Sequence, residues 1–186
     1  MADELSDRRP VLSAAQRALL EKRVRDAARA TDSPMIPARS DPSRPAPLSS
    51  PQRRLWVLDQ LVPGSSWYNV TRLFRVEGPL DPDLLKRALS AVVSRHASLR
   101  TAFPSPAGQP MQVVSSSASS SLVRLSVEGV PVEDAETRAL ALAREDAERP
   151  FDLERGPLFR AALYRLAPDR HILHFTVHHI VTDGWS

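Results

Sequence analysis

Hydrophobic and polar positions recur along the chain with two different periods, and these periods predict its helices and strands. Apolar side chains return every three or four positions in residues 51–62, 81–96 and 132–149, which is typical of amphipathic helices. A two-residue alternation predicts strands over residues 70–77, 98–103, 110–114, 122–127, 158–166 and 171–178. The resulting order predicts an α/β (α+β) sandwich with a mixed sheet and two long helices.

Local capping signals support the helix predictions. Ser49 or Ser50 can cap the helix that begins near Pro51, and proline fits a first helical turn. Asp81 can cap the clearest helix, with Pro82 as its first residue.

The first 47 residues follow a different pattern. Residues 12–30 carry apolar positions near helical spacing, so they predict a short helix. Residues 31–47 hold five prolines in seventeen positions, which indicates a semi-extended linker because proline can neither continue a helix nor donate to a ladder. We therefore expect a helix and a proline-rich linker over 1–47, with the boundary near Ala46, and one folded lobe over 48–186. Because the last strand is followed only by HIVTDGWS, we expect the lobe to be part of a larger domain.

Composition narrows the function classes. Hydrophobic residues make up 42% of the chain, which is enough for a core, while no apolar run is long enough to cross a bilayer. The chain has no cysteine, so thiolate chemistry and cysteine metal sites are excluded. Arginine alternates with acidic residues instead of gathering in one patch, and the net charge is only +3, which argues against nucleic-acid binding. The first residues lack the apolar stretch of a secretory signal, so the cytoplasm is the expected compartment.

Candidate chemistry gathers at the end of the last predicted strand, in HHIVTDGWS. The strand's period places His179 at the end of an apolar face and His178 on the opposite face, so the two rings diverge and no metal site is expected. His179 is then suited to act as a general base or a hydrogen-bonding group. Asp183 can orient an imidazole or pair with an arginine, and Gly184 can allow a tight turn through a positive φ. From the residues alone, the more common explanation of this pattern is a buried structural histidine followed by an ordinary Asp-Gly turn.

A resemblance to a known family distinguishes between these interpretations. HHIVTDGWS resembles the HHxxxDG motif of the condensation domains of nonribosomal peptide synthetases. Two further segments, in the family's order, are similar to other motifs: LSSPQRRLWVLDQL with SSWYNV, and RHASLRTAF at 95–103. The stretch PFDLERGPLFRAALYRL also resembles the one before the histidine strand, and LSAAQRALLEKR resembles the short helix that often precedes such domains. These ordered motifs extend over residues 48–186.

The resemblance implies a fold and an active-site residue. The family fold is a V-shaped pair of chloramphenicol-acetyltransferase-like lobes, with a tunnel between them that leads to the histidine motif. Residues 48–186 would be most of the first lobe, and the C-terminal lobe would be missing. His179 would be the active-site residue. His178 would support its loop, and Gly184 would permit the turn and offer its backbone N–H near the reacting carbonyl.

The family pattern also implies a structural ion pair. Asp183 would be tied to an arginine of the 95–103 segment. Arg100 is favoured over Arg95 because it follows a leucine at the start of the predicted strand and could reach inward. Ala97 replaces the family's usual glutamate at a variable position, which leaves this expectation unchanged.

The activity implied is amide-bond formation between an upstream acyl or peptidyl thioester and a downstream aminoacyl thioester. Both would be held on phosphopantetheine arms of upstream and downstream peptidyl carrier domains, next to an adenylation domain, with no cofactor or metal bound directly. The aspartates of heterocyclising relatives are absent, so peptide-bond formation is expected instead of ring closure. The alternatives are a free-standing acyltransferase that uses coenzyme A or a carrier, an epimerising relative, and a non-catalytic docking or interaction module.

Overall fold

The computed structural model describes residues 15, 18, 21–22, 41, 44–117 and 122–184. The chain divides into two units, residues 1–40 and 41–186. In the first unit, the four described residues are all helical. The other residues of the predicted helix over 12–30, and most of the predicted linker over 31–47, lie outside the described residues.

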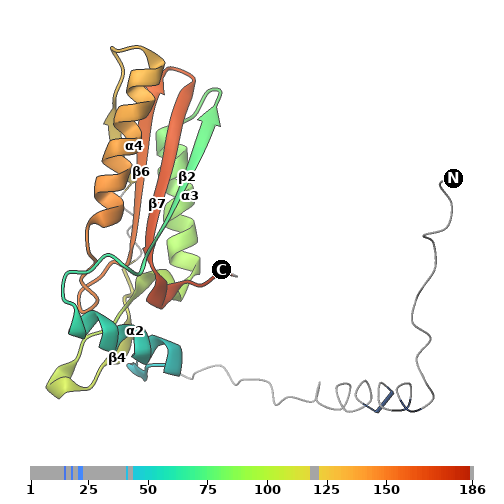
Figure 1. The fold of residues 1–186 in the computed structure, drawn as a ribbon, viewed down its shortest axis with the longest axis vertical. Coiled ribbons are helices and arrows are strands. Elements are labelled where there is room, and N and C mark those ends of the chain that lie inside the picture. Colours follow the sequence, from blue (N-terminus) through green and yellow to red (C-terminus); the bar gives the residue numbers. More distant parts are fainter. Residues whose placement is uncertain are drawn as a thin grey trace, which may run out of the picture. The chain divides into compact units, whose positions relative to one another are not determined.

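A four-stranded mixed sheet forms the centre of the second unit (Figure 1). Its strands are β2 (Asn69–Glu77), β7 (Arg170–His178), β6 (Phe159–Ala167) and β5 (Leu122–Ser126), in the order β2-β7-β6-β5. β5 runs parallel to β6, whereas the other neighbouring pairs are antiparallel. The mixed sheet predicted from the alternation pattern is confirmed, and β7, which carries the histidine motif, is an inner strand.

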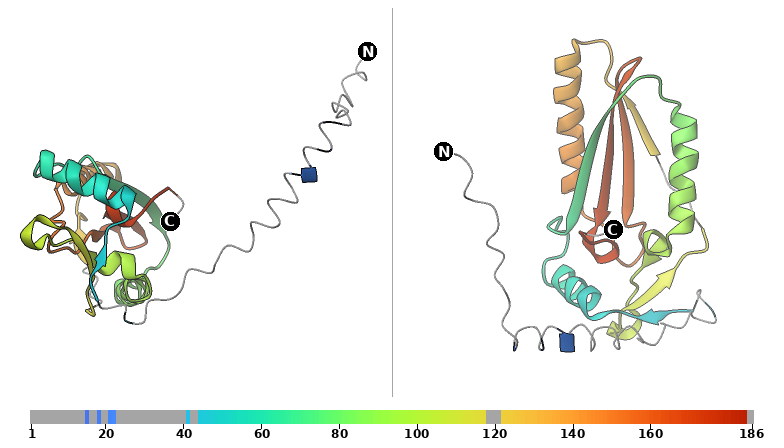
Figure 2. Two further views of the ribbon diagram at one scale, coloured as in Figure 1. Left: turned by 90° about the horizontal axis from the view of Figure 1, so that it is seen from below. Right: turned by 90° about the vertical axis from the view of Figure 1, so that its right-hand side faces the viewer.

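Two long helices cover opposite faces of this sheet, as the right-hand view of Figure 2 shows. They are α4 (Val132–Glu148) and α3 (Pro82–Arg95). The face of α4 that meets the sheet is built from alanines, whose small side chains are buried against larger ones of the sheet: Ala135, Ala139, Ala143, Tyr164 and Ile172. On the other face, leucines of α3 pack near strand residues, among them Leu85, Leu89, Leu163, Leu173 and Phe175. The even and odd positions of β6 and β7 therefore feed two separate cores, which confirms the predicted sandwich.

A smaller layer lies at the end of the sheet where β7 stops (Figure 1). It contains α2 (Ser50–Leu61) and a second sheet of β1 (Ala46–Pro47), β4 (Met111–Val114) and β3 (Thr101–Ala102). Its buried residues are Leu48, Phe103, Leu153, Leu158 and Ile180. Ile180 belongs to η3 (His179–Val181), a 3₁₀ turn that continues directly from β7. The turn that carries the histidine motif is thus anchored in this layer.

The predicted caps are present. Ser49 and Gln52 form a reciprocal capping box at the start of α2. The Asp81 carboxylate accepts hydrogen bonds from the backbone N–H groups of Asp83 and Leu84, at 2.8 and 3.1 Å. These local interactions explain why both helices start within a residue of their predicted positions.

The strand predicted over 98–103 is wrong in its first half. Residues Ala97–Arg100 form a 3₁₀ turn, η1, and extended backbone begins only at Thr101. The Thr101 hydroxyl donates to the carbonyl of Ala97 (2.9 Å), and Leu99 N–H donates to the carbonyl of His96 (3.1 Å). These local bonds turn the chain back toward the end of α3 instead of extending it.

Candidate active site

The histidine motif is held at the junction of the large sheet and the smaller layer. The backbone N–H of His178 donates to the carbonyl of Leu158 (3.0 Å), and that of His179 donates to the carbonyl of Tyr68 (2.8 Å). The two acceptors precede the neighbouring strands β6 and β2. The start of η3 is therefore fixed from both sides, and η3 instead of the strand itself carries His179.

His178 is a buried, neutral ring. It is 3% exposed and makes edge contacts with Tyr68 and Phe151, with ring centroids 6.3 and 6.2 Å away. Its Nδ1 accepts a hydrogen bond from the backbone N–H of Ile180 (3.2 Å). Burial, and then the neighbouring His179, lowers the pKa of His178 to about 4. This histidine therefore stays uncharged near neutral pH, with the Nδ1 lone pair already engaged.

His179 is exposed, and its contact with the turn determines which nitrogen is free. Its Nδ1 lies 2.7 Å from the carbonyl oxygen of Thr182. Because a carbonyl oxygen only accepts, Nδ1 must carry the proton, and the lone pair of the neutral ring lies on Nε2. This is the arrangement required of a general base or a hydrogen-bond acceptor whose orientation is fixed by the protein.

Asp183 and Gly184 follow η3, and both are exposed. Gly184 does not have the positive φ expected from the sequence; the glycines that do are Gly64, Gly78, Gly108, Gly129 and Gly156. A Cβ added at Gly184 would have no heavy atom within 4 Å. The chain leaves η3 through an extended Thr182 (φ −145°, ψ 159°).

Arg100 is the last residue of η1 and not, as the sequence had predicted, part of a strand. Its guanidinium donates to the carbonyls of Val93 (3.1 Å), Ser94 (3.2 Å) and Ser115. It thereby ties the end of α3 to the chain that leaves β4. The ion pair between Asp183 and Arg100 stays a prediction. Arg95 is the exposed last residue of α3, where a cation complements the helix dipole.

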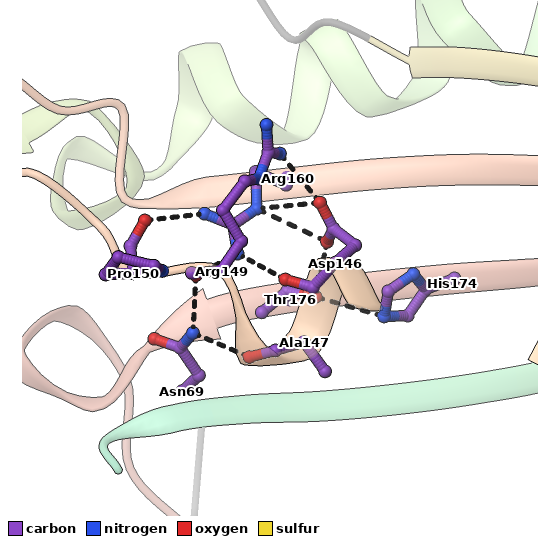
Figure 3. Close-up of polar contacts among 8 residues, drawn as sticks. All are labelled: Asn69, Asp146, Ala147, Arg149, Pro150, Arg160, His174 and Thr176. Atoms are coloured by element: carbon purple, nitrogen blue, oxygen red, sulfur yellow. Dashed lines mark hydrogen bonds and ion pairs between the residues drawn. The ribbon is translucent and has the colours of Figure 1, made fainter. Parts of the chain in front are cut away.

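Sequence reasoning missed a polar network beside the histidine motif (Figure 3). Arg160 of β6 forms an ion pair with Asp146 of α4 at 3.2 Å, and both side chains are largely buried. Thr176 of β7 donates to Asp146 at 3.0 Å, and Thr176 Oγ1 lies 3.0 Å from His174 Nε2. Burial opposes ionisation of Asp146, but the charge of Arg160 and the Thr176 hydrogen bond outweigh it and lower the pKa of Asp146. The available signal was an arginine on the inward face of β6, which needs a buried partner.

A small cavity adjoins His178. It has a volume of about 40 Å³ and is lined by Leu58, Asp59, Val62, Ser65, Trp67, Tyr68 and His178. Burial raises the pKa of Asp59, with the Gln60 hydrogen bond opposing the shift. The cavity has room for roughly one water molecule and is too small for a substrate.

In the part of the chain that the structure describes, no three histidine or acidic side chains are grouped to hold a metal ion. Nor is any described helix long and apolar enough to cross a membrane.

Known proteins resemble this chain in sequence and in fold. The sequence model of the Condensation domain family matches residues 43–186. The chain belongs to the condensation-domain family. It is 44% identical over 184 residues to the phosphinothricin tripeptide synthetase PhsC of Streptomyces viridochromogenes, covering 99% of this chain and 17% of that protein. The chain thus spans less than a fifth of the length of this relative.

Solved condensation domains share the fold. A first condensation domain of the calcium-dependent antibiotic synthetase, in complex with a substrate analogue, superposes with a TM-score of 0.68 at 30% identity, over 76% of this chain and 34% of that one. A mutant starter condensation domain of rhizomide synthetase RzmA, in complex with C8-CoA, gives a TM-score of 0.68 at 30% identity, over 74% and 31%. The described part of the second unit therefore has the condensation-domain fold, the chloramphenicol-acetyltransferase-like architecture that the motifs predict.

Proposed function

We propose that this chain supplies the histidine-bearing lobe of a condensation domain that forms an amide bond between two thioesters. The amine nitrogen of the downstream aminoacyl thioester attacks the carbonyl carbon of the upstream acyl or peptidyl thioester. A C–N bond forms, the C–S bond breaks, and the proton lost by the amine balances the thiolate that leaves. The observation that carries this proposal is the exposed His179 ring, whose Nδ1 contact with Thr182 leaves Nε2 as the nitrogen with the free lone pair.

In this proposal His179 Nε2 accepts the hydrogen of the attacking amine, as a base or as a positioning acceptor. His178 is unsuited to that role because it is buried and its Nδ1 is engaged. It serves instead as a rigid support for the turn. Asp183 and Gly184 follow the turn, and we assign them to shaping the exit of the loop. Arg100 and Arg95 lie near the end of α3, and we assign Arg100 to holding the adjoining loop through its three carbonyl contacts.

The partners follow from the reaction. Both substrates would be presented on phosphopantetheine arms, by an upstream and a downstream peptidyl carrier domain, with an adenylation domain nearby to load the acceptor. A second lobe would face His179 and complete the tunnel. These assignments rest on similarity to synthetases of which this chain covers a small fraction. If the chain acts together with these domains, its expected compartment is the cytoplasm.

The test is a condensation assay on a complete domain that contains this chain, with loaded donor and acceptor carriers. His179→Ala should lower the rate of amide formation by on the order of 10² or more, because a positioned proton acceptor is lost. His96→Ala is the matched control, since His96 is an exposed histidine at the end of α3 and should leave the rate unchanged. Full activity of His179→Ala would overturn the assignment. A domain that accepts only a donor bound to coenzyme A would favour the acyltransferase alternative.

A further inference from the structure

The segment that follows α4 is held by an arginine of the sheet. Arg160 lies on β6 opposite Thr176 of β7. Besides its ion pair with Asp146, its guanidinium donates to three backbone carbonyls, those of Asp146 (2.8 Å), Arg149 (2.8 Å) and Pro150 (3.4 Å). One side chain therefore satisfies the carbonyls at the end of α4, where helices leave acceptors unpaired, and fixes the path of the chain beyond it (Figure 3).

Asn69 holds the same segment from the other side of β7. It lies on β2 opposite His178, and its amide nitrogen donates to the carbonyls of Ala147 (2.8 Å) and Arg149 (2.9 Å). The carbonyl of Arg149 thus accepts from both Asn69 and Arg160. The two donors come from the strands on either side of the histidine strand, so the segment is positioned relative to that strand (Figure 3).

Phe151 transmits this fixed position to the histidine motif. The Arg160 guanidinium carbon lies 3.8 Å from the centroid of the Phe151 ring, in cation–π contact. The Phe151 ring in turn contacts His178, at a centroid distance of 6.2 Å and an interplanar angle of 84°. His178 accepts the Ile180 N–H inside η3, the turn whose first residue is His179. A continuous series of contacts therefore runs from Arg160 through Phe151 and His178 to the turn that orients His179.

We propose that Arg160 is a positioning residue of the condensation reaction, which acts through Phe151 and His178 to hold the His179 Nε2 lone pair in its working direction. The proposal rests on the function proposed above. Arg160 does not touch the reacting atoms. Lysine cannot replace it, because an ammonium group can pair with Asp146 but cannot span three carbonyls and stack on an aromatic ring at once.

Arg160→Lys tests the proposal because it retains the positive charge. Amide hydrogen exchange would be measured on the 186-residue chain. The amides of His179 and Ile180, which donate to Tyr68 and to His178, should exchange roughly tenfold faster than in the unaltered chain, because the turn opens locally more often. Nitrogen NMR of the His179 ring should show a smaller fraction of the Nδ1–H tautomer. Arg165→Lys is the matched control, since Arg165 is on the same strand with a more exposed ion pair to Glu128 (3.1 Å), and should change neither readout.

Phe151 provides a second, independent pair of variants. Phe151→Leu removes the ring and should speed exchange of the two amides as Arg160→Lys does. Phe151→Tyr keeps the ring, so its exchange rates should stay close to those of the unaltered chain. In a complete domain, Arg160→Lys should lower kcat about tenfold or more, with KM for the loaded carriers unchanged, because small displacements of a reacting group are costly.

The proposal is overturned if Arg160→Lys and Phe151→Leu leave the His179 and Ile180 amides and the His179 tautomer unchanged. It is also overturned if exchange accelerates while kcat does not fall. The exchange and NMR measurements need no substrate. They therefore test the link between Arg160 and His179 whatever the outcome of the His179→Ala assay.

Discussion

His178 and His179 are adjacent residues with opposite environments, because β7 ends at His178 and His179 begins η3. The side chains on the same face of β7 as His178 are buried: Ile172, His174 and Thr176. His179 leaves the strand through η3 and reaches solvent. The same type of side chain therefore supports the turn as a buried neutral ring at position 178 and is an accessible hydrogen-bond acceptor at position 179.

The buried state of His178 predicts a pH dependence of stability. Its pKa is about 4 in the folded chain against an ordinary value of 6.5, so between these values the unfolded chain binds more protons than the folded one. The stabilisation is fully present above pH 6.5 and is lost as the pH falls toward 4, to a total of roughly 3 kcal/mol. The pKa values of His171 and His174 are also lowered, chiefly by burial, so they contribute in the same direction.

Urea unfolding at several pH values checks this prediction. His178→Asn offers a carbonyl oxygen to the Ile180 N–H but does not titrate, so its free energy of unfolding should depend less on pH between 6.5 and 4 than that of the unaltered chain. A matched control is His96→Asn, at an exposed position, which should retain the full dependence. Equal slopes for His178→Asn and the unaltered chain would contradict the prediction.

At the scale of elements, α3 shows what local sequence signals can determine. Asp81 accepts two N–H groups at its first turn, and Asp81→Ala should lower the free energy of unfolding by about 1 kcal/mol. Asp134→Ala is a suitable control, because it removes a carboxylate from the first turn of α4, whose N-cap Pro131 makes no side-chain cap hydrogen bond. The cap prediction fails if thermal and urea denaturation give the two variants the same loss.

Caps, alternation and proline positions act over a few residues, so most helices and the strands of the large sheet were predicted to within one or two residues. The short strand β1 (Ala46–Pro47) was not predicted, because it forms only by pairing with the distant β4. The turn at Ala97–Arg100 was not predicted either; besides its local bonds, it is held by Arg100, which donates to carbonyls of α3 and of the chain after β4. The Asp146–Arg160–Thr176 network joins three elements, and only the fold brings them together. The sequence predicted that the rings of His178 and His179 diverge. It did not predict the Nδ1 contact that leaves Nε2 of His179 free, because this contact depends on the path of the turn up to Thr182.

At the scale of the whole molecule, the surface of the second unit, residues 41–186, bears on the proposed function. Large apolar side chains remain exposed on its strands and helices, among them Leu61 (71%), Trp67 (75%), Leu73 (41%) and Phe74 (50%). Leu61 and Trp67 lie at and just beyond the end of α2, whereas Leu73 and Phe74 lie on the outer strand β2. Leu73 and Phe74 are consecutive on this strand and point to opposite faces of the sheet, so the four side chains do not form a single patch. The chain also matches only about a third of the length of the solved condensation domains, at 34% of one and 31% of another.

We therefore expect the 186-residue chain alone to form no amide bond between carrier-bound substrates, and a complete domain that contains it to do so. In the chain alone the exposed His179 meets water, and under the proposed function the amine and the thioester would not be held in line, so the gain from positioning would be lost. The measurement is a product assay by mass spectrometry on the chain and on the complete domain at equal concentration, with His179→Ala in the complete domain as the reference for background. Sedimentation of the chain should also show self-association through its apolar surface, and weaker association for Trp67→Ser. Amide product from the isolated chain at a rate near that of the complete domain would show that a single lobe is sufficient for catalysis.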